Sequence, residues 1–426
     1  MSGLRFCMVT TFYPPYNFGG DGIGTQRFSQ ALVKRGHQVT VLQDVDAYNV
    51  LSKGDEPHEE NATDGVEVVR IRSPLSKLSV LLTQQTGRPV MNGRAMRSFF
   101  NDRSFDVINF HNISLAGGPA VLAYGDALKI YMAHEHWLVC PTHVLWRHKR
   151  ERCTGRQCLR CSLHYRRLPQ LWRYTGYLER QLEHVDAFVS MSEFSRNKHH
   201  EFGFTRDMEV VNYFLPSLPR VLTDDDSPHA RPYFLFVGRL ERIKGLDDVI
   251  PIFAHYRDAD LLIAGDGDYA PVLQKLAAGI DRVRFLGRVA PAELSRYYRH
   301  ALALIVPSVC FETFGIILIE AFRQATPVLA RRIGPFPEIV ERSGGGILFN
   351  DAGELSDAMR RLQADPSLRS KLAECGYKGF EACWAEAAVV PRYLDVVKRA
   401  ARAKGRTNIV RAIEVEPIGI DASQAD

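Results

Sequence analysis

The sequence predicts an α/β protein built from two doubly wound domains, each with a parallel sheet of the Rossmann type. Its 426 residues exceed the ~100–150 of a usual domain, so two domains of about 200 residues each are expected. Short apolar runs alternate with helical stretches, which is the pattern of a parallel sheet. This pattern ends in a polar, proline-bounded stretch at residues 216–232 and then restarts, so that stretch is the expected linker.

The N-terminal domain is expected to span residues 1–215. After its first strand, residues 25–35 carry apolar side chains at helical spacing, and Gly36 ends this helix after a basic last turn. The order of strand, glycine turn, helix and strand is the first unit of a doubly wound sheet. The strands of this domain are expected at residues 6–10, 39–42, 66–71, 107–110, 130–133 and 187–191.

The C-terminal domain is expected at residues 233–384 and repeats the same alternation. Beyond it, residues 385–404 are expected to form a helix that packs back on the N-terminal domain, and residues 405–426 a weakly structured tail. The strands of this domain are expected at residues 233–237, 261–264, 283–286, 302–306, 328–330 and 347–349.

The composition is that of an ordinary globular protein with a sizeable core, at 46% hydrophobic, 24% charged and 10% aromatic residues. The 54 Lys and Arg against 49 Asp and Glu give a net charge of +5, too small to indicate a dedicated nucleic-acid-binding protein. No apolar run reaches the ~18–20 residues of a membrane span, and the N-terminal residues lack the apolar region of a signal peptide. We therefore expect a cytoplasmic protein whose eight cysteines are reduced thiols or metal ligands.

Two cations follow the first predicted strand of the C-terminal domain, at the sheet edge where such folds bind ligands. Arg239 and Lys244 lie in the segment GRLERIKG at residues 238–245. Arginine offers a planar fork for phosphate oxygens and lysine a point charge, so the two cations and a helix N-terminus suit a diphosphate. The alternative is that both are solvated surface cations.

Two carboxylates flank a glycine in the segment ETFGIILIE at residues 312–320, which follows another predicted strand. If Gly315 starts a helix, Glu312 lies in the loop before it and Glu320 lies further along the helix. Backbone N–H groups beside such a glycine approach an anion, and carboxylates accept hydrogen bonds from sugar hydroxyls. The alternative is an ordinary glutamate at a helix N-terminus together with one exposed glutamate.

The order GRLxxxKG, followed about seventy residues later by ExFGxxxxE, resembles the GT4 family of retaining glycosyltransferases. That family has the GT-B fold, in which two Rossmann-like domains face a central cleft. The resemblance implies transfer of a hexosyl unit from a nucleotide-diphospho-sugar to an unidentified acceptor, which is a glycan, a glycolipid or a small-molecule metabolite. It covers nearly the whole chain through the segments 12–15, 19–20, 35–40, 262–267, 283–288 and 337–340.

The resemblance also implies a role for each matching residue. Arg239 and Lys244 would bind the donor diphosphate, Glu312 the hydroxyls of the transferred sugar, and His134 would lie beside the reacting sugar. The leaving phosphate would take the proton of the acceptor, so no metal or other cofactor is expected in the reaction. The loop glycines Gly19 and Gly20 would also belong to the donor-binding group. The peptides of Phe314, Gly315 and Ile316 would touch sugar and phosphate. The backbone near Arg288 would contact the nucleobase, and Glu320 would bind the ribose hydroxyls.

Four cysteines of the N-terminal domain offer the ligands for a structural zinc ion. Cys158 and Cys161 have the C-x-x-C spacing of a zinc half-site, which Cys140 and Cys153 would complete. The gap between Cys140 and Cys153 is irregular for a zinc ribbon, so free or redox-active thiols are the alternative. Neither interpretation gives the cysteines a part in catalysis.

The segment from residue 147 to residue 173 is strongly basic, with nine Arg or Lys residues against Glu151 alone. Interleaved aromatic residues and leucines make it suited to an anionic membrane surface, at the inner face of the membrane, or to a lipid-diphosphate acceptor. The alternative is a solvated helix face that covers the acceptor cleft. Nucleic acid is not an expected partner, because the net charge is small.

Two other functions compete with glycosyl transfer. One is a nucleotide-sugar epimerase or phosphorylase of GT-B fold, and the other is a non-catalytic nucleotide-sugar sensor or zinc-bridged scaffold. The intact set of polar residues at the two C-terminal segments argues against the non-catalytic function: Arg239, Lys244, Glu312 and Glu320.

Overall fold

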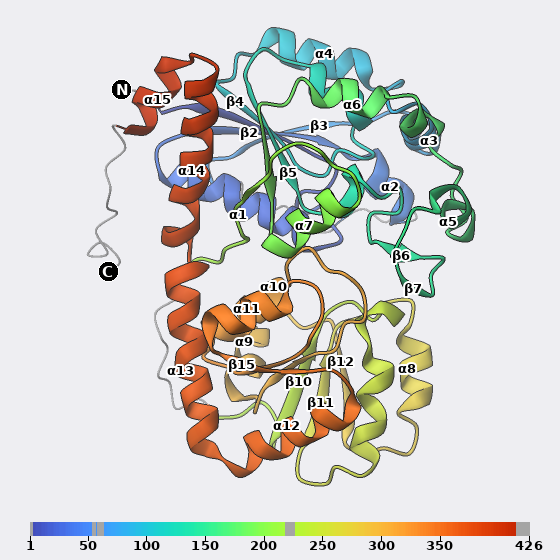
Figure 1. The fold of residues 1–426 in the computed structure, drawn as a ribbon, viewed down its shortest axis with the longest axis vertical. Coiled ribbons are helices and arrows are strands. Elements are labelled where there is room, and N and C mark those ends of the chain that lie inside the picture. Colours follow the sequence, from blue (N-terminus) through green and yellow to red (C-terminus); the bar gives the residue numbers. More distant parts are fainter. Residues whose placement is uncertain (1–2, 53–56, 58–63, 218–225, 415–426) are drawn as a thin grey trace.

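The computed structural model describes residues 3–52, 57, 64–217 and 226–414 of the chain. It consists of two parallel sheets with helices on their faces, one domain above the other in Figure 1. The predicted fold class, two doubly wound α/β domains, is thereby confirmed. Residues 218–225 of the predicted linker and 415–426 of the predicted tail lie outside the described residues.

The N-terminal sheet has seven strands in the order β3-β2-β1-β4-β5-β8-β9, all paired in parallel. The chain winds outward from β1 to β3 and then restarts on the other side with β4, so the topological switch point lies between β1 and β4. The strands are β1 (Arg5–Thr10), β2 (Gln38–Asp44), β3 (Glu67–Ile71), β4 (Val107–Phe110), β5 (Leu128–Ala133), β8 (Ala187–Ser190) and β9 (Glu209–Val210).

The C-terminal sheet has six parallel strands in the order β12-β11-β10-β13-β14-β15, so its switch point lies between β10 and β13. The loops after these two strands carry the cations and the carboxylates singled out in the sequence. The strands are β10 (Tyr233–Val237), β11 (Asp260–Ala264), β12 (Val283–Gly287), β13 (Leu304–Val306), β14 (Val328–Arg331) and β15 (Gly346–Phe349).

Helices connect the strands and cover both faces of each sheet (Figure 1). In the N-terminal domain they are α1 (Gly20–Lys34), α2 (Asp46–Leu51), α3 (Ser76–Thr86), α4 (Gly93–Asp102), α5 (Cys158–His164), α6 (Tyr177–Leu182) and α7 (Glu193–Glu201). From the C-terminal domain onward they are α8 (Ala270–Leu276), α9 (Pro291–His300), α10 (Ile316–Arg323), α11 (Phe336–Ser343), α12 (Ala352–Ala364), α13 (Pro366–Cys383), α14 (Glu386–Ala403) and α15 (Thr407–Glu414).

Short 3₁₀ helices fill several of the connections. They are η1 (Gly118–Ala123), η2 (His136–Leu138), η3 (Leu171–Tyr174), η4 (Arg242–Lys244), η5 (Leu246–Asp248) and η6 (Ile250–Ala254). The basic segment adds a short antiparallel ribbon of β6 (Trp146–Arg147) and β7 (Glu151–Arg152) before α5.

The C-terminal helices tie the two domains together. α13 lies along the lower domain and α14 continues along the upper one, where it packs on α1, β5 and β8 (Figure 1). The buried Tyr393 of α14 donates a hydrogen bond of 2.8 Å from its hydroxyl to Oδ1 of Asn109 on β4. The chain therefore returns to the N-terminal domain after completing the C-terminal one.

Two expected boundaries are wrong. The first helix begins at Gly20 rather than at residue 25, because the glycine-rich stretch before it is already helical. Residues 407–414, expected in a weakly structured tail, form α15, whose Ile409 and Ile413 are buried beside α14. The spacing of these two isoleucines by four residues places them on one face of the helix.

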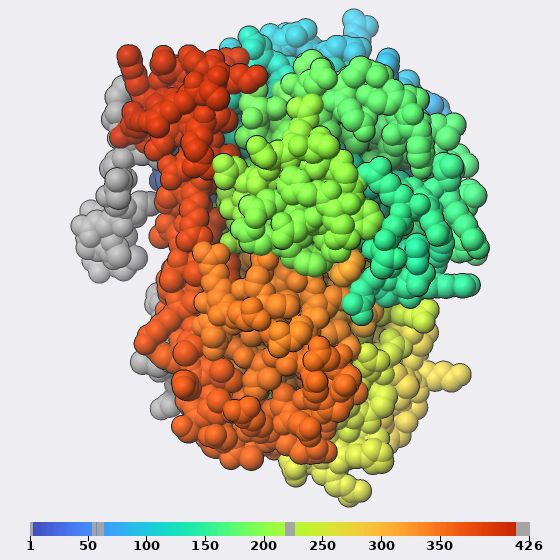
Figure 2. Space-filling model, in the orientation of Figure 1, coloured from blue at the N-terminus to red at the C-terminus, as the bar shows by residue number. Residues whose placement is uncertain are grey.

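The surface of the molecule is continuous from the upper to the lower domain in the view of Figure 2. The segment 140–175 forms the right-hand margin of the upper domain there. None of the helices within the described ranges has the length and apolar character needed to cross a membrane.

Candidate active site

Lys244 and Glu312 meet at the carboxyl edge of the C-terminal sheet. Lys244 ends η4, after β10, and Glu312 lies in the loop between β13 and α10. The Lys244 Nζ donates to Glu312 Oε1 at 2.8 Å, and Ser308 Oγ donates to the same oxygen at 2.7 Å. Two residues that are far apart in the chain thus form one polar group at the switch point.

Burial and pairing act in opposite directions on this pair. Burial disfavours both charged forms, but the attraction and hydrogen bond between the partners outweigh it. The pKa of Lys244 is therefore raised and the pKa of the Glu312 carboxyl is lowered from their ordinary values. Both side chains are charged at neutral pH.

The two predicted arginines are exposed. The Arg239 side chain is 63% exposed and pairs with Glu241 at 3.0 Å, and its charge acts on both Lys244 and Glu312. The Arg288 side chain is 88% exposed, follows β12, and lies 3.9 Å from Asp266. The exposed Arg239 thus lies near the Lys244–Glu312 pair, whereas the side chain of Arg288 points largely into solvent.

Gly315 is the residue before α10, and its φ of +116° is one that side chains other than glycine rarely adopt. A Cβ there would also lie 2.8 Å from the Phe336 ring. The N–H groups of the first turn of α10, which begins at Ile316, face the loop that carries Glu312. This helix N-terminus favours negative charge.

Helix α1 brings a second N-terminus to the same place. A Cβ on Gly20, its first residue, would lie 3.0 Å from Cδ1 of Ile316, so the two predicted donor-binding residues touch across the domain boundary. Gly19 precedes the helix in extended backbone and is held by Asn17, whose Nδ2 donates to the Gly19 carbonyl at 2.7 Å. The two domains thus present helix N-termini to each other.

Glu320 lies on α10, where it joins both domains. Tyr298 donates a hydrogen bond of 3.0 Å from its hydroxyl to Glu320 Oε2, and Arg27 of α1 lies 4.0 Å from Oε1. Burial raises the pKa of Glu320, although Arg27 and Tyr298 oppose this shift. Arg27 and Tyr298 were not singled out in the sequence, because neither lies in the motif.

His134 follows β5 and is buried among polar partners. Its Nε2 lies 2.7 Å from His111 Nδ1, and its Nδ1 is hydrogen-bonded to the Tyr213 hydroxyl. Burial lowers the pKa of His134 to about 4, which nearby Asp21 partly opposes, so the ring is neutral at pH 7. The Tyr213 ring also packs 5.8 Å from the ring of the buried Phe314, which links His134 to the loop before α10.

Direct hydrogen bonds hold the loop of Glu312 against the N-terminal domain. Thr313 Oγ1 donates to the His134 carbonyl at 2.8 Å, and Ser192 Oγ donates to the Thr313 carbonyl at 2.6 Å. On the neighbouring helix α11, Glu338 Oε2 accepts from the Phe194 N–H at 2.9 Å. The candidate catalytic residues of both domains therefore meet at one boundary.

The four predicted zinc ligands lie apart from this group, in and around the basic segment. Cys140 Sγ lies 3.3 Å from Thr142 Oγ1, and Cys153 Sγ donates to the Gly155 carbonyl at 3.3 Å. Cys161 Sγ accepts from the His148 N–H at 3.3 Å. Among the residues that the structure describes, no three His, Cys, Asp or Glu side chains are arranged to hold a metal ion. The sulfurs as placed do not fit a zinc site, and zinc stays a prediction from the spacing.

Sequence reasoning missed the side chains that support the predicted ones. They are Arg27, His111, Tyr213, Tyr298, Ser308 and Thr313. Thr313 lies within the segment 312–320 and Ser308 follows Pro307 just after a predicted strand, so these two carried a local signal. The other four belong to no local motif, since each acquires its contact through folding or domain packing.

Two family models match the chain, one in each domain. The model "Glycosyltransferase Family 4" matches residues 18–213, and the model "Glycosyl transferases group 1" matches residues 223–379. The two matched stretches contain every predicted site residue of the donor and catalytic groups.

Known glycosyltransferases and synthases resemble the chain over most of its length. The glycogen synthase of Mycobacterium tuberculosis is 24% identical over 87% of this chain and 88% of its own. A solved sucrose-phosphate synthase from Thermosynechococcus elongatus has a TM-score of 0.70 at 19% identity, over 94% of this chain and 100% of its own. Anabaena HepE in complex with UDP-glucose has a TM-score of 0.67 at 14% identity, over 93% and 100%. With the two family models and the strand order of both sheets, these matches show that the chain is a GT4-type glycosyltransferase of GT-B fold.

Proposed function

We propose that this glycosyltransferase moves a hexosyl unit from a nucleotide-diphospho-sugar to an acceptor with retention at the anomeric carbon. The observation that carries the proposal is the Lys244–Glu312 pair, which stands beside the N-terminus of α10 at the switch point of the sheet. Anabaena HepE, which shares the fold, was solved with UDP-glucose, and this favours the same class of donor here. Nucleotide binding identifies the base of the donor, and the transfer assay identifies its sugar.

The cations serve the leaving group. When the bond between the anomeric carbon and the diphosphate breaks, negative charge grows on the diphosphate and positive charge on the sugar. Lys244, Arg239 and the first turn of α10 then stabilise the transition state more than the ground state, which raises kcat. The positively charged end of α1 at Gly20 adds to the same field.

The two glutamates position the donor. Glu312 is held by Lys244 and Ser308, so its oxygens are oriented to accept hydrogen bonds from sugar hydroxyls. A carboxylate fixed in an ion pair is poorly placed to attack as a nucleophile. In the proposed step the bond from the anomeric carbon to the diphosphate breaks, the acceptor oxygen bonds to that carbon on the same face, and the leaving phosphate takes the acceptor's proton. Glu320, in the second turn of α10, accepts hydrogen bonds from the ribose hydroxyls.

His134 acts as a neutral group in this scheme. A neutral ring that accepts from Tyr213 at Nδ1 carries its proton on Nε2 and donates it to His111. The lowered pKa of His134, which results from burial, makes the ring a weak base and a poor proton acceptor at pH 7. The backbone carbonyl of His134 positions the loop of Thr313 by accepting its hydrogen bond. The neutral ring of His134 lies along one side of the sugar.

The basic segment provides a surface for a peripheral contact with an anionic membrane at its inner face. Leu163, Leu168 and Leu171 are 60%, 57% and 66% exposed there. Gln84 of α3 donates to the Leu168 carbonyl at 3.3 Å, so the exposed leucines of α3 adjoin the same surface. Apolar side chains among Arg and Lys residues suit the headgroup region of a bilayer. Co-sedimentation with phosphatidylglycerol vesicles but not phosphatidylcholine vesicles tests this contact, and equal binding to both would contradict it.

Transfer is tested by incubating the purified enzyme with the nucleotide sugar whose nucleoside diphosphate stabilises it and with a panel of glycan, glycolipid and small-molecule acceptors. The proposal expects a glycosylated product whose anomeric configuration equals that of the donor, as read by NMR. An inverted product would contradict retention. Conversion of the donor into an epimer, or phosphate-dependent cleavage, would favour an epimerase or a phosphorylase. Binding without turnover of any donor would favour a sensor or scaffold.

A further inference from the structure

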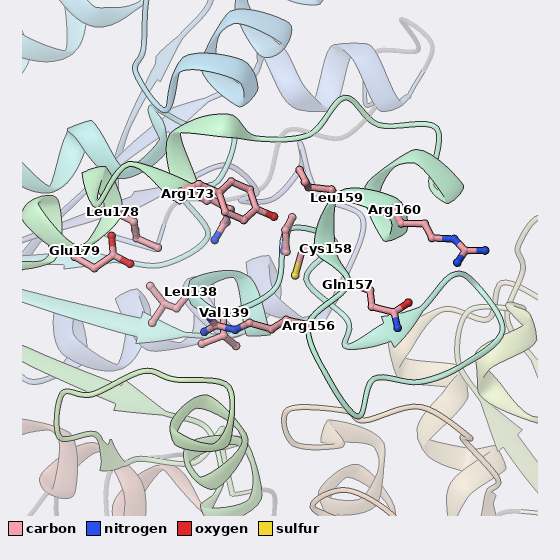
Figure 3. A pocket seen from close by; sticks show the side chains of 12 residues that line it. Leu138, Val139, Arg156, Gln157, Cys158, Leu159, Arg160, Arg173, Leu178 and Glu179 are labelled. Carbon is pink, nitrogen blue, oxygen red and sulfur yellow. The ribbon is translucent and has the colours of Figure 1, made fainter.

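A cavity of about 540 Å³ lies in the N-terminal domain, between η2, α5, η3 and α6, outside the donor site (Figure 3). Its size is within the range of ordinary ligand sites. Most of its wall is apolar, and it is formed by Leu138, Val139, Pro141, Leu159, Tyr174 and Leu178. Neither the family motifs nor the proposed donor chemistry uses these residues.

One of the polar residues that line this cavity is the partly buried Arg173. Arg173 contacts two indole rings, with its Cζ 5.1 Å from the centre of the Trp137 ring and 4.8 Å from that of Trp172. Its Nε donates to Gln170 Oε1 at 2.5 Å. Its Nη2 is buried and has no hydrogen-bond partner within the described residues. A guanidinium that lines a cavity with one unsatisfied nitrogen is positioned to receive an acceptor from a ligand.

No carboxylate is among the groups that act most on the charge of Arg173, although Glu179 lines the same cavity. The groups that act most on its charge are thiols and phenols, namely those of Cys140, Tyr131, Cys158 and Tyr174. Burial lowers the pKa of Arg173 to about 10, which still leaves it protonated at pH 7. A desolvated cation without an anionic partner costs free energy, and an anion bound in the cavity would remove that cost.

The other charged residues of the wall differ from Arg173. Arg156 donates a hydrogen bond from Nη2 to the Phe202 carbonyl, so it is engaged by the protein. The side chain of Arg160 points away from the cavity in Figure 3, and Glu179 of α6 is exposed. Arg173 is therefore the cation that a ligand in the cavity would meet.

The exposed side chains at the cavity are of both kinds. Leu159 and Tyr174, which line it, are 47% and 59% exposed, and Arg156, Gln157, Arg160 and Glu179 are the exposed polar residues of the same lining. An apolar wall with a polar rim fits a ligand that has an extended apolar body and a charged head. From this geometry we propose that the cavity binds an amphiphilic anion, with an alkyl or prenyl chain against the leucines and a phosphate or carboxylate head on Arg173.

Cys158 provides a reporter in the unmodified protein, because its thiol lines the cavity and is half-buried. Decyl phosphate and decanoate, below their micelle concentrations, serve as the two anionic probes. Either should slow alkylation of Cys158 by iodoacetamide about tenfold at ten times its Kd, by the occupancy factor 1 + [L]/Kd. Alkylation of Cys375, half-buried on α13 and remote from the cavity, should not change. The stronger of the two probes identifies the head group.

Decanol and inorganic phosphate separate the two parts of the proposed ligand. Each should protect Cys158 far less than the anionic amphiphiles do. The proposal is overturned if neither anionic probe protects Cys158, if Cys375 is slowed equally, or if decanol protects as well as decyl phosphate.

Variants test whether the head group of the ligand binds at Arg173. Arg173→Met, which keeps the stem of the side chain, should weaken decyl phosphate binding about tenfold or more. Arg150→Met, at an exposed arginine of the same segment, makes the same charge change and should bind as wild type. Unchanged binding by Arg173→Met would overturn the assignment. Should that variant unfold, Val139→Phe fills the cavity with Arg173 intact and must reduce binding, since Val139 lies in the wall.

Discussion

Thr313 Oγ1 of the C-terminal domain donates a hydrogen bond of 2.8 Å to the backbone carbonyl of His134 in the N-terminal domain. Thr313 follows Glu312, and His134 follows β5, so the bond joins the two segments that the sequence singled out in different domains. With the contact between Gly20 and Ile316, it places the proposed donor-binding groups of both domains at one boundary. The proposed site is therefore built from residues of both domains.

Glu312→Gln is expected to separate binding of the sugar from binding of the phosphates. Glutamine keeps the shape of the side chain but loses the ion pair with Lys244 and the charge toward the sugar hydroxyls. Turnover should fall about 10²-fold, the usual effect of removing one such group. Binding of the nucleoside diphosphate alone, measured by calorimetry, should be within a few-fold of wild type. A variant that loses the nucleoside diphosphate as strongly as the activity would contradict the sugar-binding role.

Glu320→Gln is expected to reduce discrimination between ribose and deoxyribose. Wild-type enzyme should bind the ribonucleoside diphosphate roughly tenfold or more tightly than its 2′-deoxy form, because the partly buried Glu320 carboxylate would lose a hydrogen bond to the sugar. The variant should bind the two forms more equally. Tyr298→Phe removes only the hydroxyl that donates to Glu320 and serves as the matched control. A wild-type enzyme without any preference would argue against Glu320 as the ribose ligand.

Acidification is expected to destabilise the fold through its buried histidines. The pKa of His134 in the folded state is about 4, below the ordinary value of 6.5, so the unfolded chain binds more protons between these values. The contribution of His134 to the free energy of unfolding is thus unchanged above about pH 7 and becomes about 2 kcal/mol less favourable by pH 5. Urea unfolding at pH 7 and pH 5 should show that the free energy of unfolding falls less in His134→Gln than in wild type. An identical fall in the variant and in wild type would contradict the lowered pKa of His134.

Tyr393→Phe is expected to destabilise the protein at the joint between α14 and the N-terminal domain. The substitution leaves Asn109 Oδ1 without its buried donor, which costs about 1–3 kcal/mol. Tyr174→Phe, at an exposed tyrosine, should change the free energy of unfolding by less than about 0.5 kcal/mol. Chemical unfolding of both variants gives the comparison. Equal stability of Tyr393→Phe and wild type would show that α14 is not held by this bond.

The strands were predictable because their signal is local. The expected strand 107–110 equals β4 and 233–237 equals β10, since continuous apolar runs between turn residues mark strands buried on both faces. Short pairings such as β6 with β7 carry no such run and were not expected. The start of α1 was missed because glycines weaken the helical pattern. A Cβ on Gly24 would lie 2.6 Å from the Tyr213 ring, so packing rather than helix propensity selects glycine there.

The site was predictable where residues follow strands and not where they meet across space. The segments after β10 and β13 were each expected to carry donor-binding residues, and Lys244 and Glu312 of these segments meet. Their ion pair was not expected, because spacing along the chain does not show which side chains meet. The approach of Arg27 to Glu320 depends on how the domains dock, which no motif in either domain encodes.

The most direct test of the donor site is thermal unfolding of the wild-type protein with UDP, GDP, ADP and dTDP in turn, beside Lys244→Ala and the exposed-lysine control Lys275→Ala. A ligand that binds only the folded state raises the midpoint. The account predicts that one of these nucleotides raises the midpoint of wild type and of Lys275→Ala but not that of Lys244→Ala. No rise with any nucleotide, or an equal rise in Lys244→Ala, would contradict it.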